Sequence, residues 1–373
     1  MTKKIGIIGG GIVGATAAFY LSKEKQHVTI LDDGVGQATS AAAGIISPWL
    51  SQRRNKEWYF LAKEGAKFYS ELIKDLEKIT STQAVYQKTG TILYKKDEKL
   101  LLKLKKLAEQ RKIEAPEIGD ISLLTARDLK RLIPNISHEE SALFISGGAK
   151  IDGALLIKLL IDATMNERNS FIQTKIRNIS YEDNAWYVSD QEKTYQFDEL
   201  ILACGAWIGE LLVPLNYSVD IRPQKGQLIE LHTSLETNNW PVMMPVGETD
   251  IIPFNNGNIL IGATHENDEG FDLKPNPLIL SSLKKDAEEF IFGLDTVDIS
   301  TVRVGTRAYT SDFSPFFGEI SSLPHLLVAS GLGSSGLTTG PIIGKTLADW
   351  VMNQTTDFEA YRHKPNQYIF KNE

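Results

Sequence analysis

The sequence predicts a composite α/β fold, in which a unit of buried parallel strands and helices is interrupted by two strand-rich stretches. Near the N-terminus, a buried apolar run leads through spaced glycines into an Ala-rich helix. Two later runs, 199–204 and 326–330, are equally apolar and also end at glycine, as expected for strands buried on both faces. Shorter strands separated by polar turns occupy 171–197, 219–265 and 299–309. Together these three patterns predict the fold class.

The N-terminal glycines have the spacing of a dinucleotide-binding turn, Gly9-x-Gly11-x-x-Gly14, directly after a strand at 5–8. In such a turn the first glycine allows the tight bend, the second lets backbone approach a pyrophosphate, and the third lets the helix pack on the strand. A second strand, 27–31, ends at Asp32, where a carboxylate can bind ribose hydroxyls. A glycine-rich turn without a ligand is the alternative, and Asp32 favours the dinucleotide site.

Helical periodicity and capping patterns predict the other helices, and apolar runs bounded by turn residues predict the other strands. Helices are expected at 15–22, 56–78, 96–112, 125–133, 153–167, 278–292 and 340–352, and further strands within 83–95 and at 143–146. The helix at 96–112 has a strongly basic outer face, which we interpret as solvated. The polar tail beyond Tyr361 is expected to end on the surface.

Composition excludes several classes of protein. The net charge of -7, from 47 acidic and 40 basic residues, argues against nucleic-acid binding. The single Cys204 excludes an intrachain disulfide, and the sequence has no Cys/His cluster, so no metal site is predicted. The apolar run 5–21 after Lys3-Lys4 imitates a secretion signal, but it contains the glycine turn. We therefore expect a cytoplasmic protein without a transmembrane segment; its oligomeric state and any peripheral membrane contact are open.

A second glycine-rich loop, Gly331–Gly336, lies between the last buried strand and the C-terminal helix. It can present a second helix N-terminus to the other end of an extended cofactor. The positive end of that helix dipole would stabilise negative charge on a reduced flavin ring. Because a nicotinamide enzyme would not need this loop, the pair of loops indicates a flavin dinucleotide.

With these features the chain resembles the D-amino-acid oxidase-like flavoproteins, most closely the branch of glycine oxidase and D-amino-acid dehydrogenase. The resemblance covers nearly the whole chain. Its anchors are the two glycine loops, Asp32, 39–44, 203–207, 223–226, 262–264, Gly305-x-Arg307 and Asp312-x-x-Pro315-x-x-Gly318. It implies an FAD-binding Rossmann-like domain of residues 1–80, 145–215 and 305–373. It also implies an inserted mixed-sheet substrate domain of residues 81–144 and 216–304.

The resemblance implies noncovalent FAD, because family members that attach the flavin covalently use a cysteine in a different context from Cys204. The ribose would lie at Asp32, the adenine at the backbone of Ile176, and the isoalloxazine near the C-terminal loop. The residues implied to bind FAD are Gly9, Gly11, Ile12, Val13, Gly14, Asp32, Asp33, Thr39, Ser40, Ala43, Gly44, Ile45, Ile176, Gly205, Gly331, Gly333, Ser334, Ser335, Gly336, Leu337 and Thr338.

Arg307 matches the arginine with which the family binds the substrate carboxylate; a surface or ion-paired arginine on a strand is the alternative. The implied reaction is FAD-dependent oxidative deamination of a small amino acid by hydride transfer to flavin N5, with oxygen or another electron acceptor. The substrate would be a D-amino acid, glycine or an N-methyl amino acid. Two alternatives stay open: a flavin dehydrogenase of a 2-hydroxy acid, and a flavin-binding subunit whose active site is degenerate.

The chain departs from glycine oxidase at three positions of the implied pocket. Asp250 stands where that enzyme has a tyrosine, Ser334 where it has a second arginine, and His265 where it has an apolar residue. We therefore expect Asp250 and His265 in the substrate pocket, with Glu248 close by; an Asp250 that points to solvent at the strand edge is the alternative. Because Arg307 is then the one cation expected there, acidic amino acids are predicted to be poor substrates.

Overall fold

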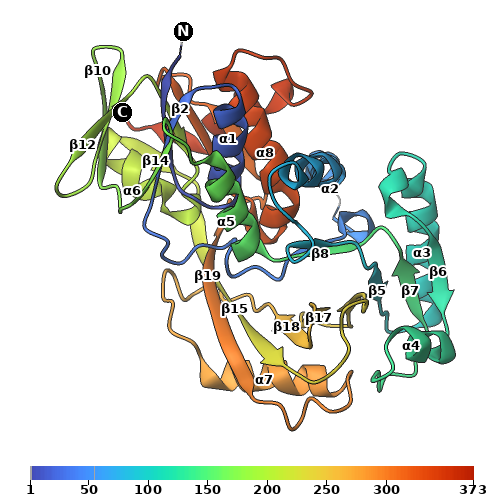
Figure 1. Ribbon diagram of the computed structural model, residues 1–373. Coiled ribbons are helices and arrows are strands. Elements are labelled where there is room, and N and C mark those ends of the chain that lie inside the picture. Colours follow the sequence, from blue (N-terminus) through green and yellow to red (C-terminus); the bar gives the residue numbers. More distant parts are fainter. Residues whose placement is uncertain (1, 54) are drawn as a thin grey trace.

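The computed structural model describes residues 2–53 and 55–373. Figure 1 shows two parts: helices α1, α2, α5 and α8 lie to one side of β2 in one, and β15, β17, β18 and β19 form a sheet above α7 in the other. The long strands β15 and β19 run from the first part into the second. Within the described residues, none of the helices combines the length and apolar character needed to cross a membrane.

A six-stranded sheet forms the centre of the first part, in the order β20-β21-β13-β1-β2-β9. Its strands are β1 (Lys4–Ile8), β2 (His27–Asp32), β9 (Ser170–Gln173), β13 (Glu199–Leu202), β20 (Phe316–Glu319) and β21 (Leu326–Ser330). All neighbours pair in parallel except β20 and β21. The strands β1, β13 and β21 are apolar without alternation because both faces of the sheet are covered.

Helices cover one face of this sheet, and a small antiparallel sheet covers the other. The helices are α1 (Ile12–Lys23), α2 (Lys56–Glu77), α5 (Gly153–Thr164) and α8 (Gly336–Val351), with α1 in contact with both α5 and α8. The small sheet comprises β10 (Asn178–Glu182), β11 (Ala185–Ser189) and β12 (Thr194–Phe197). Phe197 packs so closely on Gly6 that a Cβ there would lie 2.5 Å from its ring. The short α6 (Ile208–Leu212) follows β13.

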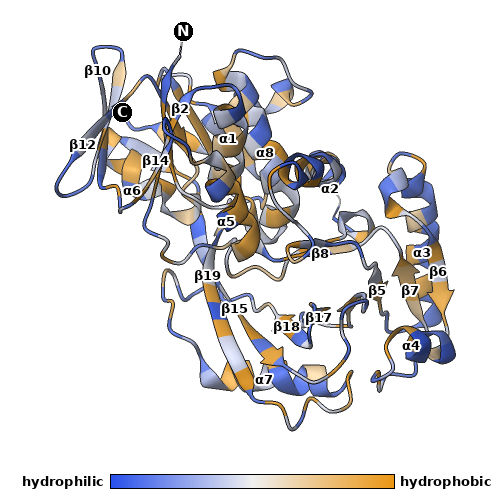
Figure 2. Ribbon diagram, viewed as in Figure 1, coloured by the Kyte–Doolittle hydropathy of each residue, from blue (hydrophilic) through white to orange (hydrophobic). Residues whose placement is uncertain are grey.

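An eight-stranded mixed sheet dominates the second part, in the order β19-β15-β18-β17-β16-β5-β7-β6. Its strands are β5 (Thr91–Leu93), β6 (Ile121–Leu124), β7 (Ala142–Ile145), β15 (Arg222–His232), β16 (Val242–Met244), β17 (Asp250–Pro253), β18 (Asn258–Gly262) and β19 (Ile299–Tyr309). Its helices are α3 (Glu98–Lys112), α4 (Ala126–Leu132) and α7 (Pro277–Glu288). Figure 2 shows hydrophilic residues along α3 and hydrophobic residues on β7 beside it.

Two smaller sheets join distant segments. One contains β3 (Ile45–Ile46), β8 (Ala149–Ile151) and β4 (Tyr86–Gln87), and the other pairs β14 (Tyr217–Val219) with β22 (Ile369–Lys371). The tail beyond Tyr361 ends on the surface as expected, with residues 370–373 exposed, but the residues just before them are anchored. Tyr368 is 5% exposed and stacks on Phe316, and Ile369 is 3% exposed. Tyr368 and Ile369 therefore fasten the C-terminal segment to the first part.

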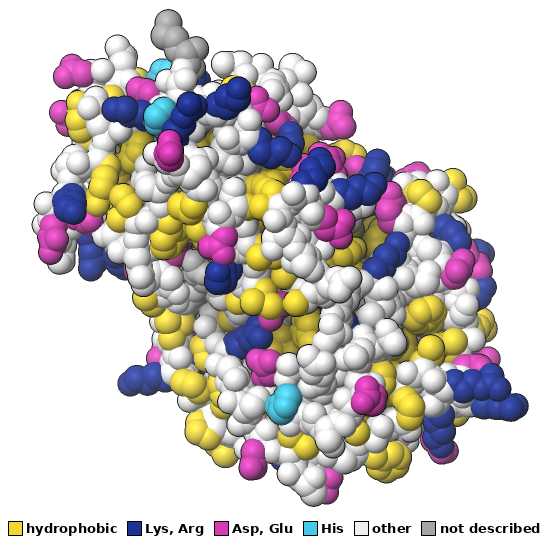
Figure 3. Space-filling view, viewed as in Figure 1, with side chains coloured by type: hydrophobic (Ala, Val, Ile, Leu, Met, Phe, Trp, Pro, Cys, Tyr) yellow, Lys and Arg dark blue, Asp and Glu magenta, His cyan; other side chains and the backbone are white. Residues whose placement is uncertain are grey.

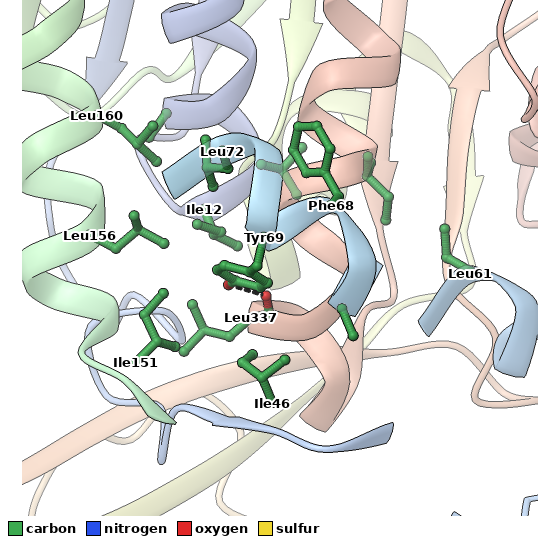
Figure 4. Packing of buried hydrophobic residues seen from close by; sticks show 14 of the residues in the cluster. Ile12, Ile46, Leu61, Phe68, Tyr69, Leu72, Ile151, Leu156, Leu160 and Leu337 are labelled. Carbon is green, nitrogen blue, oxygen red and sulfur yellow. Dashed lines mark hydrogen bonds between the residues drawn. The ribbon is translucent and has the colours of Figure 1, made fainter. Parts of the chain in front are cut away.

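The helix α8 begins at Gly336, four residues before the expected start, although Pro341 lies inside it. Proline has no N–H, so the carbonyl of Leu337 loses its helical donor. The Tyr69 hydroxyl of α2 donates to that carbonyl at 2.6 Å, as the dashed line in Figure 4 shows. In addition, α2 approaches at Gly65, where a Cβ would lie 2.2 Å from the Thr338 carbonyl oxygen. These contacts fix the first turn of α8, and with it the second glycine loop.

Candidate active site

Two cavities meet where α8 begins. The first lies at the carboxyl ends of β1, β2, β13 and β21, where open parallel sheets bind ligands. The second lies between this region and the eight-stranded sheet. Both are lined by Ala38, Thr39, Gly333 and Gly336. Because the two cavities share these residues, a ligand in the first cavity would lie next to a ligand in the second.

The N-terminal glycine turn opens the first cavity. Gly9 has φ +107°, and a Cβ on it would lie 2.4 Å from the Ala203 carbonyl oxygen. A Cβ on Gly14 would lie 1.9 Å from the Gly9 carbonyl oxygen, so this glycine allows the helix to pack on the turn. Gly11 differs, because its backbone is ordinary and a Cβ would meet only the Thr39 hydroxyl, at 3.3 Å. Its missing side chain leaves room above the start of α1.

Asp32 is held rigidly at the end of β2. Its Oδ2 accepts a hydrogen bond from the Gly10 N–H at 2.5 Å, and its Oδ1 accepts from the Gly34 N–H at 2.6 Å and from Gln37 Nε2 at 2.7 Å. Burial raises the pKa of this carboxyl group above its usual value, although the three donors oppose that shift. Asp32 therefore presents a fixed carboxyl group at the rim of the first cavity.

The helices that begin at the cavities lack side-chain caps. In α2, α3, α4, α5 and α7, the side chain of Asn55, Asp97, Thr125, Asp152 or Asn276 accepts a hydrogen bond from a first-turn N–H. The residue before α1, Gly11, has no side chain, and the side chain of the residue before α8, Ser335, accepts no hydrogen bond from a first-turn N–H. In α1 the Ile12 N–H donates to Thr39 Oγ1 at 3.1 Å. The other first-turn N–H groups and the positive helix end suit an anionic ligand. This difference between the helices fits a phosphate-bearing dinucleotide with a flavin ring.

The structure brings most of the expected cofactor residues to the cavities. The first cavity is lined by Gly9, Gly11, Ile12, Val13, Asp32, Asp33, Thr39, Ile176, Gly205, Gly331, Gly333 and Gly336. The second is lined by Ala43, Gly44, Ile45, Ser334, Ser335, Leu337 and Thr338. Gly14 and Ser40 lie outside both linings; the Ser40 hydroxyl donates to Gln37 Oε1 at 2.9 Å. Lys175 and Trp207 also line the first cavity and were not predicted.

Arg307 projects from β19 into the second cavity. Its Nη1 donates to the Thr264 carbonyl oxygen at 2.7 Å and to Gln224 Oε1 at 3.2 Å. The guanidinium lies against Gly226, where a Cβ would be 2.7 Å from Nη1. Burial lowers the pKa of Arg307 below its usual value, and nearby acidic groups oppose the shift. No carboxylate of the described residues lies within ion-pair distance of it.

Three acid–base groups line the same cavity: Glu248, Asp250 and His265. Burial raises the pKa of Asp250 to about 7, and its carboxyl group has no hydrogen-bond partner among the described side chains and backbone. His265 Nδ1 lies 3.5 Å from Glu248 Oε2. Burial, and then the charge of Arg307, lower the pKa of His265, so the imidazole is neutral at pH 7. The predicted pocket positions of all three residues agree with this lining.

Two further cations line the second cavity, Arg53 and Lys95. The expectation that Arg307 is the only cation of the pocket is therefore wrong. Arg53 lies in the loop before α2, and Lys95 follows β5. Neither residue is near a recognisable motif, and both are far from Arg307 in the chain, so the sequence contained no signal for them. The tertiary fold alone brings them to the cavity.

Comparison with known proteins settles the family. A family model described as FAD dependent oxidoreductase matches residues 4–350. The chain belongs to the FAD-dependent oxidoreductase family. FAD is therefore its cofactor, and the predicted composite α/β fold with a Rossmann-like FAD unit is confirmed, as is the resemblance to D-amino-acid oxidase-like flavoproteins.

Similar proteins cover nearly the whole chain. The "Uncharacterized oxidoreductase YurR" of Bacillus subtilis (strain 168) is 37% identical over 362 residues, which are 96% of this chain and 97% of the relative. The glycine oxidase of Pseudomonas putida is 27% identical and covers 91% of this chain and 92% of its own length. The crystal structure of iminodiacetate oxidase from Chelativorans sp. BNC1 has a TM-score of 0.91 and 30% identity, with 96% of this chain and 99% of that chain covered.

Proposed function

We propose that this member of the family oxidises the carbon that bears the amine of a small amino acid. The products would be a 2-oxo acid and ammonia, or a free amine where the nitrogen is substituted. The observation that carries the proposal is Arg307, a buried cation without an ionic partner in the described chain, in a cavity that adjoins the proposed FAD site. The names of two relatives, glycine oxidase and iminodiacetate oxidase, support an acid that carries an amine.

Arg307 would bind the substrate carboxylate. Its Nη1 is engaged by Thr264 and Gln224, which leaves Nε and Nη2 to donate. Charge-assisted bonds from a guanidinium to a carboxylate are short and directional, especially when two form in parallel. Gly226 has no side chain, so the guanidinium can lie flat against the backbone there. Its bonds to Thr264 and Gln224 hold it in that position, and turning away would break both. A fixed arginine would therefore orient the substrate, which is the protein's main contribution in a flavin enzyme.

FAD would occupy the first cavity and end in the second, held noncovalently. The glycine turn and Asp32 would bind its dinucleotide part, and the uncapped start of α8 would approach its ring. When bound, FAD supplies a two-electron acceptor for the C–H bond beside the amine. Burial raises the pKa of the Cys204 thiol at this cavity to about 12. The thiol stays protonated and weakly nucleophilic, which supports noncovalent binding.

Asp250 would bind the amine. Above its pKa of about 7 the carboxylate can attract a substrate ammonium and hold the proton that the amine must lose. A neutral His265 adds no positive charge beside that ammonium. An amine substrate thus finds an anion at Asp250 and a cation at Arg307. A 2-hydroxy acid would gain only the second of these interactions.

The experiment is a substrate panel with the holoprotein under anaerobic conditions. Glycine, N-methylglycine, D-alanine and D-lysine are mixed with the enzyme, alongside the 2-hydroxy acids of matching carbon skeleton, and loss of flavin absorbance is followed. We expect amines to reduce the flavin and to release ammonia or methylamine, with oxygen or another electron acceptor restoring the absorbance. Reduction by hydroxy acids alone, or by no compound of either class, would contradict the proposal.

A further inference from the structure

We propose that Arg53 and Lys95 form a second anion subsite in the substrate cavity, which selects amino acids that carry another carboxylate at the end away from Arg307. The inference rests on the proposed function for the role of Arg307. It reverses the expectation that acidic amino acids are poor substrates.

The charges lining the second cavity differ from those of the whole molecule. The chain carries a net charge of -7, yet this lining contains the cations Arg53, Lys95 and Arg307 against the acidic Glu248 and Asp250. On the face drawn in Figure 3, acidic and basic side chains are interspersed instead. Near pH 7 Asp250 is only partly ionised and His265 is neutral. The cavity is therefore net positive and attracts anions.

Arg53 and Lys95 are available for a ligand. In the described parts of the chain, neither side chain forms an ion pair with a carboxylate or donates a hydrogen bond. The Arg53 guanidinium lies 4.8 Å from the centre of the Trp58 ring, and the Trp58 Nε1 donates to Ser335 Oγ at 3.1 Å. This cation–π contact restricts the arginine without neutralising it. Because the Trp58 ring already restricts the Arg53 side chain, that side chain loses little conformational entropy when an anion binds to it.

Other contacts bring the loop that carries Arg53 to the β5 edge of the cavity. The Ser47 and Thr91 hydroxyls share a hydrogen bond of 2.9 Å, which joins this loop to β5. Arg111 of α3 donates to the carbonyl oxygens of Trp49 and Ser51, at 2.5 and 2.7 Å. Figure 1 shows the loop before α2 on the same side of the molecule as β5 and α3. The loop with Arg53 and the strand before Lys95 therefore belong to one end of the cavity.

Arg307 belongs to the other end. It lies on β19, which is separated from β5 by four strands of the eight-stranded sheet, β15, β18, β17 and β16. With strands about 4.8 Å apart, the backbones of β19 and β5 are roughly 24 Å apart along the sheet. Met244 and Asp250 line the cavity between them. A substrate that reaches both ends must have its two acidic groups separated by a chain, with the amine close to Arg307 and Asp250.

Binding of unreactive ligands to the holoenzyme tests the subsite independently of turnover. Dicarboxylates from glutarate to dodecanedioate are titrated, so that the series covers the gap that the side chains of Arg307, Arg53 and Lys95 leave between the strands. Each is compared with the monocarboxylate that lacks its distal carboxyl group, and the dissociation constants are read from the flavin absorbance. We expect the best dicarboxylate to bind at least about tenfold more tightly than its partner, a difference of about 1.4 kcal/mol. Arg53→Gln combined with Lys95→Gln should remove that preference, and the charge-preserving pair Arg53→Lys with Lys95→Arg should restore most of it.

Lys56→Gln combined with Lys96→Gln is the matched control, because it removes two positive charges from exposed residues close to Arg53 and Lys95 in the chain that do not line the cavity. It should keep the preference. If no dicarboxylate binds more tightly than its partner, or if the preference survives Arg53→Gln combined with Lys95→Gln, the subsite does not exist. Turnover is then compared between D-2-aminoadipate, iminodiacetate and N-methylglycine. A dicarboxylate preference in binding without turnover of any amine would refute the proposed function and leave the subsite intact.

Discussion

Gly11→Val should abolish FAD binding while leaving the fold intact. Gly11 has φ -71° and ψ -173°, an extended conformation that valine adopts without strain, and its Cβ would meet only the Thr39 hydroxyl, at 3.3 Å. The methyl groups beyond that Cβ would extend into the space above α1 that the dinucleotide needs. The substitution therefore separates ligand binding from folding, which Gly14→Val cannot do, because its Cβ would lie 1.9 Å from the Gly9 carbonyl oxygen.

The expected size of the effect follows from linkage. FAD at about 100 times its dissociation constant stabilises the folded wild type by about 2.7 kcal/mol. For a chain of this size, about 2 °C per kcal/mol gives a rise in Tm of roughly 5 °C on adding FAD. Gly11→Val should show no such rise and no bound flavin, with a Tm close to that of wild-type apoprotein. Flavin absorbance after desalting and thermal unfolding with and without FAD measure both quantities.

Gly209→Val is the matched control, since Gly209 lies in α6, lines neither cavity, and has nothing within 4 Å of its added Cβ. It should bind FAD like the wild type. A folded Gly11→Val protein that retains stoichiometric FAD would refute the placement of the cofactor along the glycine turn.

Three other substitutions have distinct expected outcomes. Arg307→Lys keeps the charge but loses the planar fork, so kcat/KM for the best amine should fall at least about tenfold at unchanged flavin content; kinetics within twofold of wild type would mean that the guanidinium does not bind substrate. Asp250 ionises near pH 7, so kcat/KM should rise with pH through about 7, and Asp250→Asn should remove that step from the pH profile; a profile that keeps the step assigns it to another group. Lys150 is fully buried, donates to the carbonyl oxygens of Trp240 and Pro253, and has its pKa lowered by burial to about 7. Below pH 7 Lys150 is protonated in both the folded and the unfolded chain. Between pH 7 and about 10 it is protonated mainly in the unfolded chain, which therefore binds more protons than the folded chain. The free energy of unfolding should rise across that window by a few kcal/mol. Urea unfolding at several pH values should show this rise in the wild type and lose it in Lys150→Met; an identical pH dependence in both proteins would contradict it.

Local patterns in the sequence were sufficient for most of the fold. The glycine turn, the strand ending at Asp32 and the helix capped by Asp152 are encoded within short windows, and each element forms close to its expected bounds. The elements that were missed depend on distant partners. The strand β6 exists because it pairs with β7, and β22 because it pairs with β14. The early start of α8 depends on Tyr69, 268 residues away along the chain, which satisfies the carbonyl left by Pro341. The domain boundaries stay a prediction.

The candidate site was predictable where its residues belong to motifs. The residues of the glycine loops and Arg307 stand in recognisable spacings, and all of those predicted to bind a ligand except Gly14 line the two adjoining cavities. Lys175 and Trp207 were missed beside the first cavity, and Arg53 and Lys95 beside the second. Arg53, Lys95 and Lys175 lie in connections between helices and strands, and Trp207 ends a short 3-10 helix after β13. No local pattern marks any of these side chains as a cavity residue. The raised pKa of Asp250 likewise arises from burial, which its sequence neighbours do not reveal.

Anaerobic single-turnover reduction of the flavin tests the central claim most directly, that Arg307 holds the carboxylate of an amine substrate. The best amino acid of the panel is compared with the amine that lacks its carboxylate, in the wild type and in Arg307→Gln, with Arg168→Gln as an exposed control. The account predicts that the amino acid reduces wild-type flavin at least about tenfold faster than the bare amine, and that Arg307→Gln, but not Arg168→Gln, loses this advantage. An advantage of the same size in Arg307→Gln would contradict the account.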